Sequence, residues 1–333
     1  MIELKTPRGL PVSVPEIEIE DPSPKFRLED SGSIKNYYNE NGYVIIKALF
    51  SEKQCLEIRK LWDREVKHFD GYIYRQATAK AERHIKNDNG WVMNPILNIQ
   101  SMDPEHFPQF RRYATENILC DIKLSKVFSN ILNDAPKIVQ SMYFEGNSAT
   151  WEHQDSYYLD SETIGEMSAA WIALENITAL AGRFFVCPKS HKIQLEKHGP
   201  SNNIAENHED YISSVVKKIR DEKLPIRAPM LNQGDVLFWN SRTIHGSLDS
   251  QDAENSRSSI TCHAIPNKKK FLQMQSRTFN LITEKTNETF IFRPKDLGKL
   301  KNRVIFNIES RFPILFYYLK KKAIIFILKN KAA

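Results

Sequence analysis

The sequence predicts a mainly β protein with flanking helices, whose core is a double-stranded β-helix, or jelly roll. Two observations lead to this fold class. The two clearest helical patterns lie before Pro136, and short segments rich in β-branched and aromatic residues, separated by turn residues, follow them. Helices followed by many short strands are typical of two packed antiparallel sheets with helical buttresses. The length of 333 residues allows one large domain with elaborations.

The first part of the chain contains the clearest helix signals. A short strand is expected over 43–46, directly after an Asn-Gly turn. Ser51 and Gln54 match a capping box, so a helix is expected from Ser51 to about residue 68. A second helix is expected over 121–133, because its apolar residues fall on one helical face.

The jelly roll is expected to contain five strands that mix β-branched, aromatic and small residues, over 138–144, 168–174, 183–187, 236–240 and 258–265. The polar stretch 193–230 predicts an insertion with its own helix around 211–220.

These segments define a domain division. Five prolines among charges in the first 25 residues predict an extended, unpacked arm over 1–30. The main domain is expected over 31–289, with a helical part at 31–135 and the jelly roll at 136–289. Residues 290–333 form a basic amphipathic tail.

The net charge of +6 is unevenly distributed. Residues 290–333 contain eleven Lys and Arg against Asp296 and Glu309, which gives +9 and leaves −3 for the other 289 residues. Bulky aliphatic residues dominate the tail, so we expect no nucleic-acid partner. Its apolar runs are too short to span a bilayer. The alternatives for 304–333 are peripheral contact with an anionic membrane, docking on a partner and docking on the enzyme body.

The four cysteines are far apart and form no CxxC motif, which disfavours a disulfide framework or a zinc ribbon. The opening residues lack an apolar run, so no signal peptide is expected. We therefore expect a cytoplasmic protein or one peripheral to a membrane. The sequence does not indicate an oligomeric state.

Three separated residues or motifs suggest a metal site. His153 and Asp155 are two positions apart, so in a strand their side chains point to one side, and imidazole with carboxylate suits a divalent first-row metal. His245 follows an apolar strand and could complete a two-His, one-carboxylate triad. Arg257 opens the last strand and offers a planar fork for a carboxylate. Taken singly, each also fits a surface turn or an ordinary strand end.

Together they form a compound pattern: HxD, about 90 residues, a His after a Gly-Asp-initiated strand, and an Arg twelve residues later. This pattern resembles the phytanoyl-CoA dioxygenase family of Fe(II)/2-oxoglutarate-dependent oxygenases, which have a cupin-like jelly roll and include bacterial ectoine hydroxylases. The stretches SAAWIAL (168–174) and TALAGRFFVCPKSHK (178–192) resemble two further family segments. The resemblance covers about 36–266.

The chain departs from the family pattern at two places. Ala181-Gly182 replaces the usual Asn-Gly, and Pro188-Lys189 replaces Pro-Gly, but neither position supplies a metal ligand. The acid is present as Asp155, so the resemblance implies a hydroxylase and not a halogenase.

The resemblance also implies roles for individual residues. The catalytic centre would be Fe(II) held by His153, Asp155 and His245. Arg257 would pair with the distal carboxylate of the co-substrate 2-oxoglutarate. Other residues expected around the co-substrate are Trp171, Ser247 and Met142, although core packing is the alternative for Trp171 and Met142.

The implied reaction uses O2 to hydroxylate an unactivated C–H of a small or lipid-linked metabolite, with succinate and CO2 as co-products. Tyr157 and Tyr158 are candidate substrate contacts, with strand-end packing as the alternative. Loops 71–100 and 193–230 are expected around the mouth of the barrel. Two alternatives are a jelly-roll binding or scaffold protein without turnover, and an oxygenase whose outcome is desaturation or demethylation.

Overall fold

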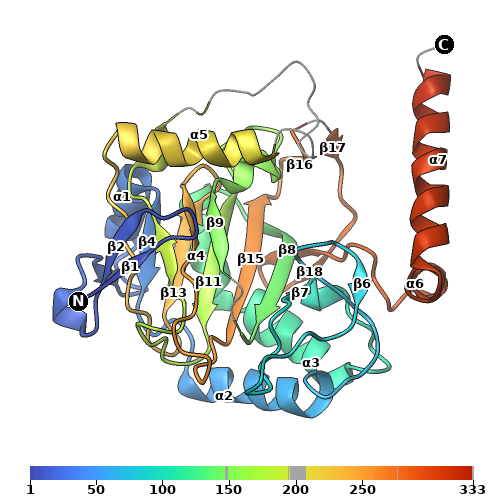
Figure 1. The fold of residues 1–333 in the computed structure, drawn as a ribbon, viewed down its shortest axis with the longest axis horizontal. Helices are drawn as coiled ribbons and strands as arrows, with labels where there is room; N and C mark the ends of the chain where they lie inside the picture. The colour runs from blue at the N-terminus through green and yellow to red at the C-terminus, as the bar shows by residue number, and fades with distance from the viewer. Residues whose placement is uncertain (147–148, 194, 196–207, 276, 332–333) are drawn as a thin grey trace.

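The computed structural model describes residues 1–333 except 147–148, 194, 196–207, 276 and 332–333. Its centre is a large, mostly antiparallel sheet (Figure 1). The strand order is β18 (Thr283–Thr286), β19 (Thr289–Phe292), β8 (Pro136–Phe144), β15 (Ser259–Pro266), β11 (Ser168–Ala173), β13 (Val236–Asn240), β4 (Tyr43–Ile46) and β3 (Lys25–Phe26), with β7 (Ile96–Leu97) also paired to β8.

A smaller sheet faces it, in the order β12 (Phe184–Val186), β14 (His245–Ser247) and β9 (Thr150–His153). A third sheet continues from this region, in the order β10 (Leu159–Ser161), β16 (Phe271–Gln273) and β17 (Arg277–Phe279). A short hairpin, β5 (Ile73–Tyr74) and β6 (Ala81–Glu82), lies in the loop region before β7. This arrangement of sheets is the expected jelly roll.

The six strands expected from the sequence are present as β4, β8, β11, β12, β13 and β15, with ends shifted by one or two residues. The helices are also as expected: α2 (Glu52–Leu61) continues as a π turn over Trp62–Val66, and α4 covers Ile122–Leu132. Ser51 and Gln54 form both hydrogen bonds of the capping box.

Strand alternation divides the core into two layers. One face of the large sheet packs under α1 (Ser31–Asn41), α2, α3 (Pro108–Tyr113) with its π-helical continuation Ala114–Leu119, and α4. The other face looks into the barrel, where Trp171, Leu237 and Trp239 pack with Phe184 of the small sheet. Period-two alternation therefore selects the residues that can reach the barrel interior.

The first residues are not an unpacked arm, which corrects the expectation for 1–30. Strands β1 (Ile2–Lys5) and β2 (Pro11–Val14) form a hairpin. Val12 and Val14 are buried against Phe185 and Leu248. The prolines lie at the borders of the strands, and the alternating valines bury one face of the hairpin.

The predicted insertion contains α5 (His208–Asp221), which lies across the small sheet (Figure 1), and most of the chain leading into it is outside the described residues. The tail forms α6 (Leu300–Arg311) and α7 (Pro313–Lys331). Figure 1 shows α7 standing beside the barrel and not over it.

All four cysteines are free and buried. Burial raises the pKa of Cys55 to about 11 and that of Cys120 to about 12, and it also raises the pKa of Cys187 and Cys262.

Candidate metal centre

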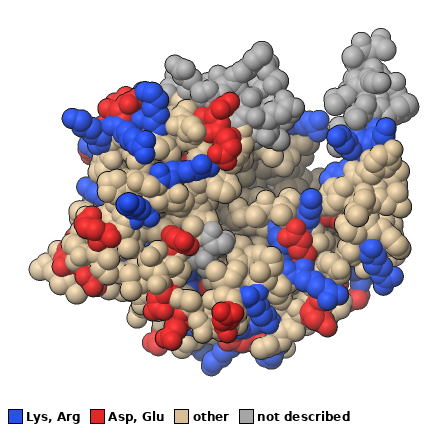
Figure 2. Space-filling model, viewed as in Figure 1, with Lys and Arg blue, Asp and Glu red and all other residues tan. Residues whose placement is uncertain are grey.

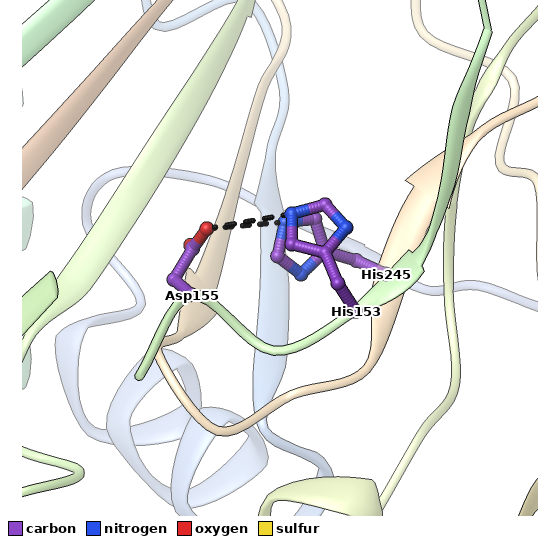
Figure 3. Close-up of side chains that lie close together, drawn as sticks. All are labelled: His153, Asp155 and His245. Atoms are coloured by element: carbon purple, nitrogen blue, oxygen red, sulfur yellow. Dashed lines mark ion pairs between the residues drawn. The ribbon is translucent and has the colours of Figure 1, made fainter. Parts of the chain in front are cut away.

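The two histidines of the predicted triad lie on neighbouring strands of the small sheet. His153 ends β9, His245 begins β14, and the two are direct partners in the strand register. Their ring centroids are 4.3 Å apart. Asp155 begins the 3-10 turn Asp155–Tyr157 directly after β9, so its carboxylate turns back toward the rings (Figure 3). One ligand atom from each of the three residues lies within 4.8 Å of the others.

Both imidazoles are oriented by backbone carbonyls. Nδ1 of His153 donates to the Trp151 carbonyl at 2.8 Å, and Nδ1 of His245 donates to the Thr243 carbonyl at 2.9 Å. Because a carbonyl only accepts, the proton of each neutral ring is on Nδ1, and Nε2 keeps its lone pair. The Nε2 atoms lie 3.7 and 3.5 Å from Oδ1 of Asp155. Two imidazole lone pairs and one carboxylate oxygen thus converge on one point.

The protonation states also suit a metal. Burial lowers the pKa of His245 to about 3, outweighing the opposite effect of Asp155. Burial raises the pKa of Asp155, but positive charge on His245 and His263 when they are protonated, together with hydrogen bonds from His153 and His263, outweighs burial and holds this pKa well below its usual range. A neutral imidazole and an ionised carboxylate are the metal-binding forms.

Two further residues hold the other carboxylate oxygen. Nε1 of Trp239 donates to Oδ2 of Asp155 at 2.8 Å, and Nε2 of His263 lies 3.3 Å from the same oxygen. Their hold on Oδ2 leaves Oδ1 facing the two imidazoles. Neither residue was predicted from the sequence to belong to the site. Side chains alternate between the two faces of a strand, and this alternation could have indicated that Trp239 and His263 point into the barrel.

The register of the large sheet brings Met142 and Trp171 to one level. Thr261 of β15 is the direct partner of Met142 on β8 and of Trp171 on β11. Direct partners share a sheet face, so all three line the barrel interior. At the neighbouring level, His263 is the partner of Gln140 and Ala169. The structure therefore places Met142 and Trp171 one level away from the residue that contacts Asp155.

Arg257 is a buried cation without a carboxylate partner among the described residues. It is 2% exposed, and its guanidinium donates to the Gly182 carbonyl at 2.9 Å, while its Nε has no partner. The guanidinium carbon lies 5.4 Å from the Phe144 ring and 5.8 Å from the Trp171 ring. Burial lowers the pKa of Arg257 to about 9. In contrast, the buried guanidinium of Arg75 has three acceptors.

The remaining predicted residues lie in two places. Ser247 is buried on β14, two positions after His245, opposite Phe184 of β12. The ring of Tyr158 lies 5.8 Å from that of His153, and its hydroxyl bonds Nε2 of His208 at 2.8 Å. Tyr157 stacks on Tyr211 of α5 at 3.6 Å. Tyr158 thus adjoins the triad, whereas Tyr157 packs against the α5 layer.

A cavity of about 820 Å³ lies among β5, β8, β16, β19 and α6 (Leu300–Arg311), and His153, Asp155 and His245 are not among its lining residues. Aromatic and aliphatic side chains dominate its walls, including Phe107, Val139, Phe271, Phe279, Phe292 and Phe306. Residues of the predicted loop 71–100 also contribute. Gln140, the direct strand partner of His263, is one of its lining residues.

The phytanoyl-CoA dioxygenase family model matches residues 38–257, which is more than half of the chain. The chain belongs to the phytanoyl-CoA dioxygenase family. The peroxisomal phytanoyl-CoA dioxygenase of Bos taurus is 25% identical over 244 residues, covering 69% of this chain and 66% of the bovine protein. Phytanoyl-CoA dioxygenase 1 of Oryza sativa subsp. japonica is 24% identical, covering 69% and 86% of the two chains. The chain thus spans just under two thirds of its mammalian relatives.

Solved structures of low identity share the fold. The α-ketoglutarate-dependent carbocyclase SnoK aligns with a TM-score of 0.54 and 16% identity, covering 75% of this chain and 89% of SnoK. The epimerase SnoN, solved with Fe3+, α-ketoglutarate and nogalamycin RO, aligns with a TM-score of 0.54 and 14% identity, covering 80% and 99%. EctD of S. alaskensis, solved with 2-oxoglutarate and 5-hydroxyectoine, aligns with a TM-score of 0.50 and 16% identity, covering 78% of this chain and 84% of the EctD chain.

The side chains of this centre fit the cofactor set of the family. Two Nε2 lone pairs and one carboxylate oxygen form the facial arrangement that suits non-haem Fe(II) and leaves other coordination positions open. Buried Arg257, which has no carboxylate partner in the described part of the chain, matches an anionic co-substrate, because a buried guanidinium is satisfied best by a bidentate carboxylate.

Proposed function

We propose that this chain is an Fe(II)/2-oxoglutarate-dependent oxygenase that hydroxylates an unactivated C–H of a small or lipid-linked metabolite. The proposal rests on one observation: a triad with its ligand atoms in their metal-binding forms lies in the same domain as a buried arginine that has no carboxylate partner among the residues that the structure describes. His153, Asp155 and His245 would hold the metal, and Arg257 would bind the distal carboxylate of 2-oxoglutarate. A scaffold protein would gain nothing from the cost of burying this unpaired cation.

The protein contributes positioning and exclusion of water. The Trp151 and Thr243 carbonyls hold the imidazole rings in the ligating tautomer. Trp239 and His263 hold Asp155. Trp171, whose ring lies 5.8 Å from the guanidinium carbon of Arg257, and Met142 would wall the co-substrate. Bound iron and 2-oxoglutarate would supply the O2-dependent chemistry that oxidises the substrate C–H and releases succinate and CO2.

The cavity of about 820 Å³ that Gln140 lines is the proposed substrate site. Its apolar walls would hold the body of the substrate, and Gln140 would meet it near His263. Tyr158 would meet the substrate from the side of His153, and Ser247 would assist Arg257. Desaturation and demethylation are alternative outcomes of the same centre. A cytoplasmic or membrane-peripheral location belongs to the proposal.

Two measurements test the proposal in sequence. Anaerobic addition of Fe(II) and 2-oxoglutarate should produce a weak visible absorption band, which His153→Ala should abolish and His106→Ala, at an exposed histidine, should not. Aerobic incubation with a library of sugars, phospholipids, amino acids and acyl thioesters should then release succinate with the true substrate. Absence of the band from the unmutated protein would contradict the oxygenase proposal. A band without succinate release from any library member would favour the binding-protein alternative.

A further inference from the structure

Helix α6 has one face on the protein body and one face turned away from it. On the inner face, Phe306 packs edge-on against Tyr74 with centroids 5.1 Å apart. Glu309 is 2% exposed and accepts hydrogen bonds from the Tyr74 hydroxyl and the Ala81 amide. These contacts fix the rotation of α6 and therefore determine which side chains point outward.

The outward face is apolar. Leu300, Val304, Ile308 and Phe312 follow one another at four-residue spacing, which places them along one side of the helix. The first turns of α7 continue the apolar surface. Eight large apolar side chains of α6, the connection and the start of α7 are between 48% and 88% exposed. They are Leu300, Val304, Ile308, Phe312, Ile314, Leu315, Tyr318 and Leu319. We call these eight residues the tail surface. So many large apolar side chains on adjoining turns indicate a binding surface.

Basic side chains surround the tail surface. Between Leu297 and Lys331 the only acidic residue is Glu309, which is turned inward, whereas the exposed charged side chains are all Lys or Arg: Lys299, Lys301, Arg311, Lys320, Lys321 and Lys322. In Figure 2 this segment is the column at the right edge of the molecule, beside a hollow in the body. The surface therefore combines exposed apolar side chains with charge of one sign.

We propose that the tail surface docks on an anionic lipid membrane. Bulky apolar side chains flanked by Lys and Arg suit the interface of a bilayer, where the former enter the acyl boundary and the latter meet lipid phosphates. No helix among the described residues is long and apolar enough to cross a membrane, so α6 and α7 would lie at its surface. A symmetric dimer through the same surface would oppose like charges, which disfavours a second copy as the occupant.

Docking would also orient the proposed substrate site. Leu300 and Val304 belong to the tail surface and also line the cavity of about 820 Å³. The part of the cavity wall that Leu300 and Val304 form would then lie at the bilayer. The docking proposal does not depend on the oxygenase activity, because vesicle binding requires neither iron nor 2-oxoglutarate.

Vesicle cosedimentation of the full-length protein tests the proposal. The protein should sediment with phosphatidylcholine vesicles that contain phosphatidylglycerol and should stay in the supernatant with phosphatidylcholine alone. The triple substitution Lys320→Glu, Lys321→Glu and Lys322→Glu should weaken binding on the order of a hundredfold or more, since each lysine near an anionic surface contributes severalfold. The double substitution Leu315→Ser and Leu319→Ser should also weaken it, and more strongly at high salt.

The matched control is Lys53→Glu, Lys60→Glu and Lys126→Glu, which makes the same charge change at exposed lysines of α2 and α4. This variant should bind the anionic vesicles within about twofold of the unmutated protein, as expected of charges distant from the docking surface. Equal loss in both triple variants, or no vesicle binding by the unmutated protein, would overturn the proposal. So would a Leu315→Ser, Leu319→Ser variant that changes only the oligomeric state in sedimentation velocity, since the surface would then join two copies.

Discussion

Arg257 gives the sharpest prediction, because its substitution should change stability and co-substrate binding in opposite directions. Its pKa is lowered by burial from 12.5 to about 9, which corresponds to about 5 kcal/mol disfavouring the charged form in the folded protein. Arg257→Met removes this cation and keeps an apolar side chain of similar length. We expect the ligand-free variant to gain about 1–4 kcal/mol in free energy of unfolding, the range found when buried ion pairs are replaced by hydrophobic residues.

The same substitution should weaken 2-oxoglutarate binding. Removing one partner of a buried, hydrogen-bonded charge pair costs about 3–5 kcal/mol, which is roughly a hundredfold to several thousandfold in Kd. Anaerobic titration calorimetry with Mn(II) in place of Fe(II) measures this affinity, and urea unfolding measures stability.

Arg75→Met is the matched control, because Arg75 is 1% exposed but has three hydrogen-bond acceptors. It should lose stability, since buried acceptors are left unpaired, and should keep its 2-oxoglutarate affinity. Our reasoning would be refuted if Arg257→Met bound 2-oxoglutarate like the unmutated protein, or if it were destabilised as much as Arg75→Met.

Three further predictions concern other parts of the molecule. His263→Leu should weaken Mn(II) binding about 10–100-fold by releasing Asp155, and His263→Gln, which keeps a donor, should restore most of it in a calorimetric titration. The free energy of unfolding should fall by about 2 kcal/mol as the pH decreases from 6.5 toward 4. Burial lowers the pKa of His84 to about 4, so in this range the unfolded chain binds a proton that the folded protein does not. Urea unfolding of His84→Gln should lack this pH-dependent loss of stability. Gly234→Ala should lower the melting temperature, because φ is +87° and the new Cβ would lie 2.1 Å from a backbone carbonyl oxygen, whereas Gly32→Ala, with open space around it, should not.

The sequence predicted five strands of the large sheet, β4, β8, β11, β13 and β15, because both of their faces are buried and their residues are strongly β-forming, but it did not predict β3, β7, β18 or β19 of the same sheet. It did not predict β9 or β14, which are four and three residues long. In strands that short, His153 and His245 occupy positions at which apolar residues would otherwise show the alternation that predicts a strand. The triad was nevertheless identified, since spacing and residue type identify metal ligands without a strand assignment.

The roles of Trp239 and His263 depend on tertiary register, which one sequence does not specify. His263 reaches Asp155 because β15 pairs with β11 in one register and has an irregularity next to His263 in its pairing with β8. A shift of one residue would turn His263 out of the barrel. The packing of β1 and β2 was missed for a related reason: two alternating valines are too short a pattern to outweigh five prolines.

The four buried cysteines have a consequence for how this protein can be handled and studied. A thiol reacts with oxidants and alkylating reagents through its exposed thiolate, and here burial suppresses both exposure and ionisation. Air or a stray oxidant released beside a working iron centre would therefore find no ready thiol to attack in the folded chain. Alkylation would proceed only when a segment opens, so the labelling rate of Cys55 would report opening around α2 and that of Cys262 opening of the central sheet.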